Sequence, residues 1–388
     1  MKRVYMDYAA STPVRREVLE GMMPYFSEKY GNASSLHSFG REAFEAVENA
    51  RKIIAGVINA EPGEIIFTSG GTEADNLALQ ETAYANRNRG NHIIVSSIEH
   101  DAVLQTAKFL EKDGFSVTRL PVDKCGLISL DELENSVTKD TILVSIMHAN
   151  NEIGTIEPVG EIGKICKERN VIFHTDAVQT FGKIPIDVKK MNIDLLSISS
   201  HKIYGPKGVG ALYVRKGVKM HPLFHGGGQE SGLRSGTENV AGIIGFGKAA
   251  ELACVEMDAE AKRLAKLRDK LIAGALKIDN TWLNGHATER LPNNANLCFK
   301  FIEGEGLVIL LDEAGIAAST GSACSSKSLE PSHVLLAIGL KHEEAHGSLR
   351  LTLGRETAES DVDYLLSVLP GCVERLRRIS PFKKGFEV

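Results

Sequence analysis

Cysteine is scarce in this sequence, with six residues in 388, and no two of them form a CxxC pair. That scarcity argues against a disulfide framework and against a structural zinc site. No stretch approaches the roughly 20 apolar residues of a membrane span, and residues 1–7 lack the apolar centre of a signal peptide. We therefore expect a soluble protein of the reducing cytoplasm that makes no contact with a membrane.

An excess of basic residues is also missing. Lysine and arginine number 45 against 50 aspartates and glutamates, which leaves a net charge of −5, and the two signs are interspersed along the chain. Nucleic acid is therefore not an expected partner. The hydrophobic content of 43% can fill more than one core, and 388 residues exceed the usual size of a single domain. Small molecules and proteins are the expected partners.

Short runs rich in β-branched residues alternate with amphipathic helical patterns from residue 64 onward. The expected strands cover residues 65–68, 93–96, 116–120, 142–146, 171–174 and 195–199. The expected helices between them cover residues 73–86, 102–112, 130–137 and 159–169. Such alternation predicts a mostly parallel sheet between helices. A seventh run, residues 209–214, follows too closely for a helical crossover, so it should pair antiparallel with a neighbour.

Further helical patterns cover residues 15–30, 39–58 and 240–277, and the last third of the chain mixes helix and strand. We expect an α/β protein in three parts. Residues 1–15 form an N-terminal arm that packs with the smaller domain. Residues 16–255 form a large domain with a mixed, mostly parallel seven-stranded sheet between helices, and residues 256–388 form a smaller α+β domain.

Lys202 and Asp176 each close a short apolar run, at places where the strands of an open sheet bring ligand-binding side chains together. Pyridoxal phosphate needs an amine to form a Schiff base and an acidic partner that keeps its pyridine nitrogen protonated. The two residues together are suited to that cofactor. Either residue alone reads equally well as a solvated charge at the end of a strand.

The turn at residues 68–73 joins an expected strand to an expected helix with two glycines and several hydroxyl groups. Its free N–H groups and the helix dipole could hold a phosphate, although glycine-rich turns also arise for steric reasons. The pattern GxxxxGK[ST] is absent, which argues against an ATP-binding loop. His100, Asn151 and Gln179 also follow strands, where a ring or an amide can face a ligand or simply complete a turn.

Cys324 lies in a run of small residues, Ser319-Thr320-Gly321-Ser322-Ala323-Cys324. A reactive thiol needs partial exposure, which this polar surrounding favours over the buried position that a lone cysteine usually takes. Arg350 alternates with apolar residues, as the residues on one face of a strand do. It could therefore form a bidentate contact with a carboxylate or a structural ion pair.

These segments together resemble the cysteine desulfurases of the NifS/IscS subgroup, which belong to the class-V aminotransferase family of fold-type I pyridoxal phosphate enzymes. The resemblance covers nearly the whole chain. It is carried in order by Asp7-Tyr8-Ala9-Ala10, Gly70-Gly71-Thr72-Glu73, His174-Thr175-Asp176-Ala177-Val178-Gln179, Ser200-His201-Lys202, Arg234-Ser235-Gly236-Thr237 and Gly321-Ser322-Ala323-Cys324.

The resemblance implies a role for each matching residue. Lys202 would be the Schiff-base lysine, His100 would stack on the ring and assist proton transfer, and Cys324 would be the nucleophile that accepts sulfur. Asn151 and Arg350 would bind the substrate, and Thr237 would reach the cofactor of a second subunit. The implied cofactor-binding residues are Gly71, Thr72, His100, Asn151, Asp176, Gln179, Ser199, Ser200, His201, Lys202 and Thr237.

The implied activity converts L-cysteine into L-alanine and leaves a persulfide on Cys324, which supplies sulfur for iron–sulfur cluster assembly. The implied partners are a second copy of the chain and an IscU/NifU-like scaffold protein, and Cys324 would transiently ligate a 2Fe–2S cluster shared with that scaffold. Two alternatives stay open. One is a selenocysteine lyase or an aminotransferase built on the same fold, and the other is a sulfur-pathway scaffold without catalysis.

Overall fold

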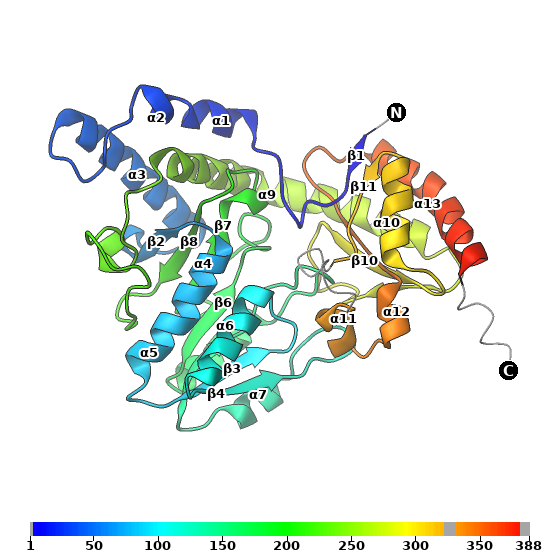
Figure 1. The fold of residues 1–388 in the computed structure, drawn as a ribbon, viewed down its shortest axis with the longest axis horizontal. Coiled ribbons are helices and arrows are strands. Elements are labelled where there is room, and N and C mark those ends of the chain that lie inside the picture. Colours follow the sequence, from blue (N-terminus) through cyan, green and yellow to red (C-terminus); the bar gives the residue numbers. More distant parts are fainter. Residues whose placement is uncertain (1–2, 322–330, 381–388) are drawn as a thin grey trace.

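The computed structural model describes residues 3–321 and 331–380, and its largest element is a mixed seven-stranded sheet (Figure 1). The strand order is β2-β8-β7-β6-β5-β3-β4, and only β8 runs antiparallel to its neighbours. The strands are β2 (Ile65–Thr68), β3 (His92–Ser96), β4 (Ser116–Leu120), β5 (Thr141–Ser145), β6 (Ile172–Asp176), β7 (Leu195–Ser199) and β8 (Gly210–Val214). The predicted mixed, mostly parallel sheet is confirmed.

Both faces of the sheet are covered by helices, which explains why its strands are buried along their length, apart from the edge strand β4. In β2, the side chains of Ile65 and Phe67 belong to one hydrophobic core and that of Ile66 to another. The first core includes residues of α3 (Ser38–Val57), α7 (Leu130–Ser136) and α8 (Val159–Glu168). The second includes residues of α4 (Gly71–Asn76), a π-helical turn (Leu77–Glu81), α5 (Thr82–Asn86) and α6 (Asp101–Lys112).

A third core lies around a separate antiparallel sheet of order β12-β10-β9. Its strands are β9 (Thr281–Asn284), β10 (Asn294–Phe299) and β12 (Ser348–Thr352), and its helices are α10 (Gly304–Glu313) and α13 (Glu359–Ile379). Two short helices, α11 (His333–Ala337) and α12 (His342–His346), belong to a fourth core that includes Ile98 and Met147. The N-terminal strand β1 (Val4–Tyr5) pairs in parallel with β11 (Ile316–Ala317) beside this sheet (Figure 1). The first residues of the chain are therefore attached to its C-terminal part.

One long helix, α9 (Val240–Ala275), connects the two regions and crosses the whole molecule in Figure 1. Near its beginning, Ile243 and Phe246 are buried in the core of the large sheet. Near its end, Leu267 and Leu271 are buried in the core of the small sheet. The same helix therefore supports both walls of any site between the sheets.

The predicted single helix over residues 15–30 is wrong in detail, because two short helices, α1 (Arg16–Met22) and α2 (Pro24–Ser27), occupy that stretch. Pro24 has no N–H to donate and begins the second helix, so the break follows from the proline. Within residues 3–321 and 331–380, we find no helix with the length and apolar character needed to cross a membrane.

Candidate active site

A cavity of about 290 Å³ lies at the carboxyl ends of the parallel strands, where open α/β sheets bind their ligands. It is closed from the other side by the N-terminal arm and by β12. Residues from separated parts of the chain share this cavity wall, and they are Ala9, Ala10, Gly71, Thr72, Asp75, His100, Met147, Ala149, Asn151, Asp176, Val178, Gln179, Ser199, His201, Lys202, Gly321 and Arg350. Nine of the predicted cofactor-binding residues therefore meet around the cavity, together with Arg350.

Lys202 ends a short 3-10 turn, Ser200–Lys202, that directly follows β7. Its amine donates hydrogen bonds to the backbone carbonyls of Ala9 and Ala10, the second at 3.0 Å. The arm is further joined to this turn because the Thr12 hydroxyl donates to the His201 carbonyl at 3.0 Å. The amine is thus held at the cavity wall by backbone groups that carry no recognisable sequence signal.

Asp176 ends β6 and is buried beneath the cavity. Its Oδ1 accepts a hydrogen bond from the Val178 N–H at 2.8 Å. Burial raises the pKa of the Asp176 carboxyl, and the charges of His100 and Lys202 act in the opposite direction. A cationic partner inside the cavity would therefore relieve the cost of the buried carboxylate.

Asp75 places a second buried carboxyl in the same cavity, which the sequence did not single out. Its pKa is raised well above the usual range by burial and by the charge of Asp176. Its Oδ1 lies 3.6 Å from Nε2 of the buried His174. The only available signal was its position one turn into α4, after the glycine-rich turn.

Gly71 begins α4 and lines the cavity at the end of the glycine-rich turn. A Cβ at this position would lie 2.8 Å from Cγ2 of Val178, so a larger residue would have to displace the Val178 side chain. Thr72, Ser199 and His201 line the cavity with it. Burial, followed by the charges of neighbouring lysines, lowers the pKa of His201 to about 4, so its ring is neutral at pH 7.

His100 precedes α6, and its Nδ1 accepts a hydrogen bond from the Ala102 N–H at 3.1 Å. A neutral ring with Nδ1 as acceptor carries its proton on Nε2, so His100 can donate from that nitrogen. Gln179 donates from Nε2 to the Ala9 carbonyl at 3.0 Å. Asn151 lines the cavity, and its own carbonyl accepts from Arg350 at 3.1 Å.

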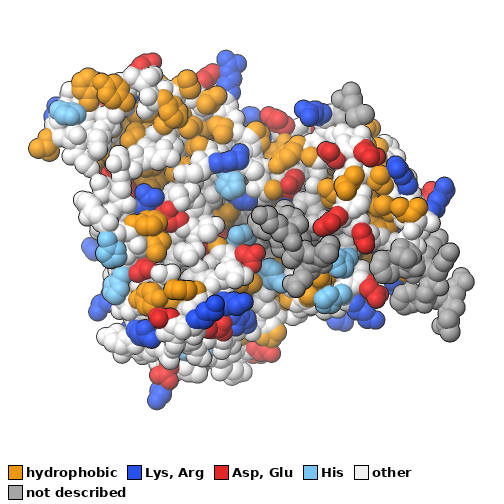
Figure 2. Space-filling model, in the orientation of Figure 1, with side chains coloured by type: hydrophobic (Ala, Val, Ile, Leu, Met, Phe, Trp, Pro, Cys, Tyr) orange, Lys and Arg blue, Asp and Glu red, His pale blue; other side chains and the backbone are white. Residues whose placement is uncertain are grey.

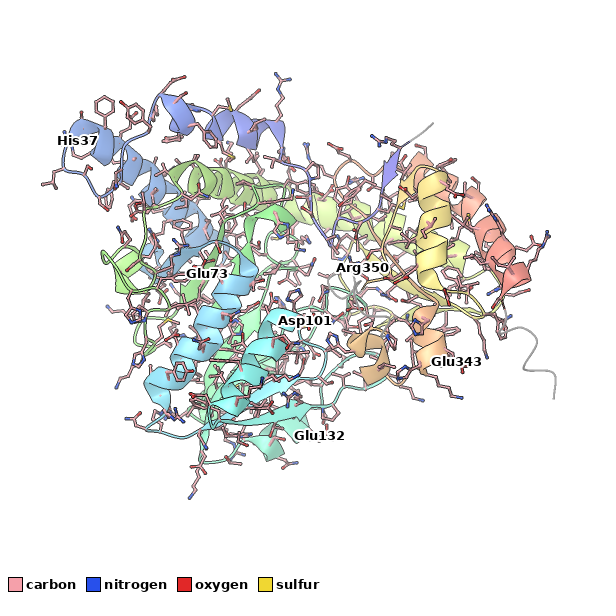
Figure 3. The ribbon with its side chains drawn as sticks, in the orientation of Figure 1. His37, Glu73, Asp101, Glu132, Glu343 and Arg350 are labelled. Carbon is pink, nitrogen blue, oxygen red and sulfur yellow. The ribbon has the colours of Figure 1, made fainter. Side chains whose placement is uncertain are left out.

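Arg350 comes from β12, which confirms the predicted strand, and it lies between the two sheets (Figure 3). Its side chain is 3% exposed and forms an ion pair with Asp7 at 2.9 Å. A second terminal nitrogen donates to the carbonyls of Asn151 and Gly321, at 3.1 and 3.3 Å. The guanidinium therefore faces the cavity from the C-terminal side, opposite the Lys202 turn.

Three of the predicted site residues do not line this cavity. Ser200 is fully buried, and its hydroxyl lies against Gly205 instead. Thr237 lines a separate cavity of about 160 Å³ with Arg234 and Glu230. Cys324 lies outside the described residues, and Gly321, three positions before it in the sequence, lines the main cavity.

These features fit pyridoxal phosphate. The cavity offers an amine at Lys202, a buried acid at Asp176 and the glycine-rich turn at Gly71 with the hydroxyl groups of Thr72 and Ser199 beside it. Those are the groups that an aldehyde, a pyridine nitrogen and a phosphate require. Among residues 3–321 and 331–380, no three histidine, cysteine, aspartate or glutamate side chains gather as a metal site would require.

Comparisons with known proteins identify the family of the chain. The family model described as "Aminotransferase class-V" matches residues 4–365. A "Cysteine desulfurase IscS" of Methanosarcina thermophila is 60% identical over 380 residues, which cover 98% of this chain and 94% of that protein. A protein of the same name from Dictyoglomus turgidum is 58% identical over 390 residues and covers 100% and 99% of the two chains.

Solved structures show the same likeness. One named "NIFS-LIKE PROTEIN" has a TM-score of 0.91 at 44% identity and covers 97% of this chain and 100% of its own. Another, "SspA in complex with cysteine", has a TM-score of 0.81 at 41% identity and covers 90% and 98%.

Proposed function

The chain belongs to the class-V aminotransferase family and is a pyridoxal-phosphate-dependent cysteine desulfurase, and from this premise we propose how its residues divide the reaction. The substrate is L-cysteine and the first product is L-alanine. The carbon–sulfur bond of the substrate breaks, a sulfur–sulfur bond to the thiolate of Cys324 forms, and the enzyme keeps the sulfur as a persulfide.

The observation that carries the proposal is the placement of Lys202 and Asp176 on one cavity of about 290 Å³. When bound, the cofactor supplies an aldehyde that takes up the substrate amine and a ring that withdraws electrons from the substrate α-carbon. Asp176 keeps the ring nitrogen protonated. The Lys202 amine removes the α-proton, and Arg350 holds the substrate carboxylate.

The described cysteines support Cys324 as the nucleophile, because none of them lines the cavity. Cys166 and Cys298 are buried, and burial raises the pKa of each thiol to about 12, so neither forms a thiolate at neutral pH. Cys254 is exposed on α9, away from the cavity.

The test separates the cofactor step from the sulfur step. Cys324→Ala should still change the visible absorption of the bound cofactor when L-cysteine is added, but it should form no persulfide and no sulfide. Lys202→Ala should be inactive with every substrate. Cys254→Ala is the matched control and should keep wild-type turnover, because that thiol lies outside the cavity.

Two results would contradict the proposal. The first is wild-type sulfide release from Cys324→Ala, which would remove that thiol from the reaction. The second is borohydride reduction that attaches the cofactor to a residue other than Lys202. Turnover that requires a 2-oxo acid would instead indicate an aminotransferase.

We also propose that the enzyme is a homodimer. Large apolar side chains are exposed on α1 to α3 and the segment between them, where hydrophobic atoms gather at the upper left of Figure 2. Leu36 is 90% exposed, Tyr30 67% and Phe26 62%. Such a patch is unusual on a monomer. Thr237, outside this chain's main cavity, is then free to serve the cofactor of the second subunit.

Light scattering measures the subunit number directly. The wild type should have twice the mass of one chain, and the double variant Phe26→Asp/Leu36→Asp should shift toward the monomer. A monomeric wild type at micromolar concentration would contradict the dimer. Thr237→Val should then lower cofactor affinity without changing the subunit number.

We further propose that the persulfide passes to an IscU/NifU-like scaffold in the cytoplasm, and that Cys324 transiently ligates a 2Fe–2S cluster on that scaffold. The support is the resemblance of the Gly321-Ser322-Ala323-Cys324 segment to the NifS/IscS subgroup. Cluster formation on a purified scaffold, supplied with iron and L-cysteine, should require this enzyme and fail with Cys324→Ala. Equal cluster formation with that variant would contradict the role.

A further inference from the structure

A second cavity lies behind the Lys202 turn and shares Lys202 with the main cavity. It is lined mainly by apolar side chains, including Met257 and Leu264 of α9, and by Lys183. Lys183 belongs to the turn that follows Asp176 and Gln179. The residue therefore approaches Lys202 from the side of the second cavity.

Lys183 determines which way the Gln179 amide points. The ammonium group of Lys183 donates to Oε1 of Gln179 at 3.3 Å, and Nε2 of Gln179 donates to the Ala9 carbonyl at 3.0 Å. A protonated lysine can only donate, and a backbone carbonyl can only accept. The two partners thus fix the amide with its oxygen toward Lys183 and its NH2 group toward the arm and the cavity.

Lys183 also places a second amine close to Lys202. Removal from water and, as the smaller cause, the charge of Lys202 together lower the pKa of Lys183 to about 7. In the part of the chain that the structure describes, no carboxylate lies within ion-pair distance of its Nζ. The other charged groups of this cavity include Arg15 and Arg355, both paired with Glu256, and Glu260, paired with Arg263.

We propose that Lys183 is a positioning residue, which orients the Gln179 amide toward the phenolate oxygen of the cofactor and keeps a second positive charge behind Lys202. This inference rests on the proposed function, since it concerns the same cofactor. A nearby cation makes a second cation less favourable. Lys202 should therefore lose its proton more readily, as an amine that must accept the substrate α-proton requires.

The test uses the cofactor-loaded enzyme and four variants. Lys183→Met removes the charge, Lys183→Gln removes it but keeps a polar group, and Lys183→Arg keeps both the charge and the donor. Lys190→Met is the matched control, because the Lys190 side chain is 85% exposed and pairs only with Asp187 on the same surface. The readout is the pH midpoint at which the visible absorption of the bound cofactor changes.

In Lys183→Met and Lys183→Gln the midpoint should rise by about one pH unit, the size of effect expected of one nearby charge. In Lys183→Arg and Lys190→Met it should stay within a few tenths of the wild type. The turnover number should fall several-fold in the two neutral variants, with the KM for L-cysteine unchanged.

An unchanged midpoint in both neutral variants would overturn the inference, even if activity fell. An equal rise in Lys183→Arg would overturn it as well, because the charge would then not be responsible. Failure of the proposed function looks different, since the wild type would then show no visible cofactor band and borohydride would not label Lys202.

Discussion

Arg350 and Asp7 form a buried ion pair at 2.9 Å, although 343 positions separate them in the sequence. The contact joins the N-terminal arm to β12 directly above the cavity. Among the described residues, Nε of Arg350 is buried without a hydrogen-bond partner. A buried unsatisfied donor is costly, so this N–H group is suited to donate a hydrogen bond to the carboxylate of a substrate.

Asp7→Asn should strengthen substrate binding. The substitution removes a negative charge that competes with the substrate carboxylate for Arg350, while it keeps the side-chain volume. We expect the KM for L-cysteine to fall by roughly threefold to tenfold, since one charge–charge contact of this kind is worth about 1 kcal/mol near a protein surface. Asp7→Glu, which keeps the charge, is the control. A large rise in KM for Asp7→Asn would show that Asp7 mainly orients the arginine.

Arg350→Lys should weaken substrate binding without affecting the cofactor. A lysine keeps the positive charge but loses the planar pair of donors that fits a carboxylate. We expect the KM for L-cysteine to rise about tenfold or more, with an unchanged absorption spectrum before substrate is added. Arg169→Lys, at an exposed ion pair with Glu134, is the control. An unchanged KM for Arg350→Lys would mean that the carboxylate binds elsewhere.

Arg51→Met should destabilise the fold strongly. Arg51 donates from two nitrogens to Glu230 at 2.7 and 2.8 Å, and Glu230 also accepts from the Phe67 N–H. Both residues are buried. Removal of the arginine leaves a buried carboxylate without its partner, which costs about 3–5 kcal/mol in the free energy of unfolding.

Urea denaturation at a fixed excess of cofactor measures this loss. The control is Arg119→Met, because the Arg119–Glu111 pair is largely exposed and should contribute less than about 1 kcal/mol. A loss below about 1 kcal/mol for Arg51→Met would contradict the prediction.

Glu157→Gln should stabilise the protein at alkaline pH. Burial raises the pKa of the Glu157 carboxyl to about 8 in the folded protein, from an ordinary value of 4.5 in the unfolded chain. Between pH 4.5 and 8 the folded state binds a proton that the unfolded state has lost. The free energy of unfolding therefore falls as the pH rises through this window, and it levels off above the folded pKa.

The neutral glutamine avoids that loss, so the stability of Glu157→Gln relative to wild type should rise by about 4 kcal/mol between pH 4.5 and 8. Unfolding curves at these two pH values measure the difference. Glu132→Gln, at an exposed site in α7 (Figure 3), should show no such gain. A pH-independent difference for Glu157→Gln would show that its carboxyl ionises normally.

Much of the fold could be predicted because local signals agreed with the final packing. Most strands of the large sheet are short apolar runs buried on both faces, and the close spacing of residues 199 and 210 required an antiparallel partner. The helix over residues 15–30 was predicted too long, because its apolar spacing continues across Pro24 while the proline ends the hydrogen-bond pattern.

The candidate site was less fully predictable. Lys202, Asp176 and Arg350 were visible as polar residues in apolar runs, and their meeting at one cavity follows from the sheet. The hydrogen bonds from Lys202 to the Ala9 and Ala10 carbonyls could not be predicted from the sequence, because every residue has the same backbone carbonyl. Asp75 was hidden in an ordinary helical pattern, and the separation of Thr237 from the main cavity depends on the path of a loop.

The continuous helix α9 has a consequence for how this chain can change in evolution. A helix advances about 1.5 Å and turns about 100° with each residue. Val255 is 82% exposed and lies between the two buried ends of α9. One residue inserted there would therefore rotate the small sheet, with Arg350, about the axis of α9 and away from Lys202. Surface loops can lengthen freely, but the number of residues in α9 must stay constant.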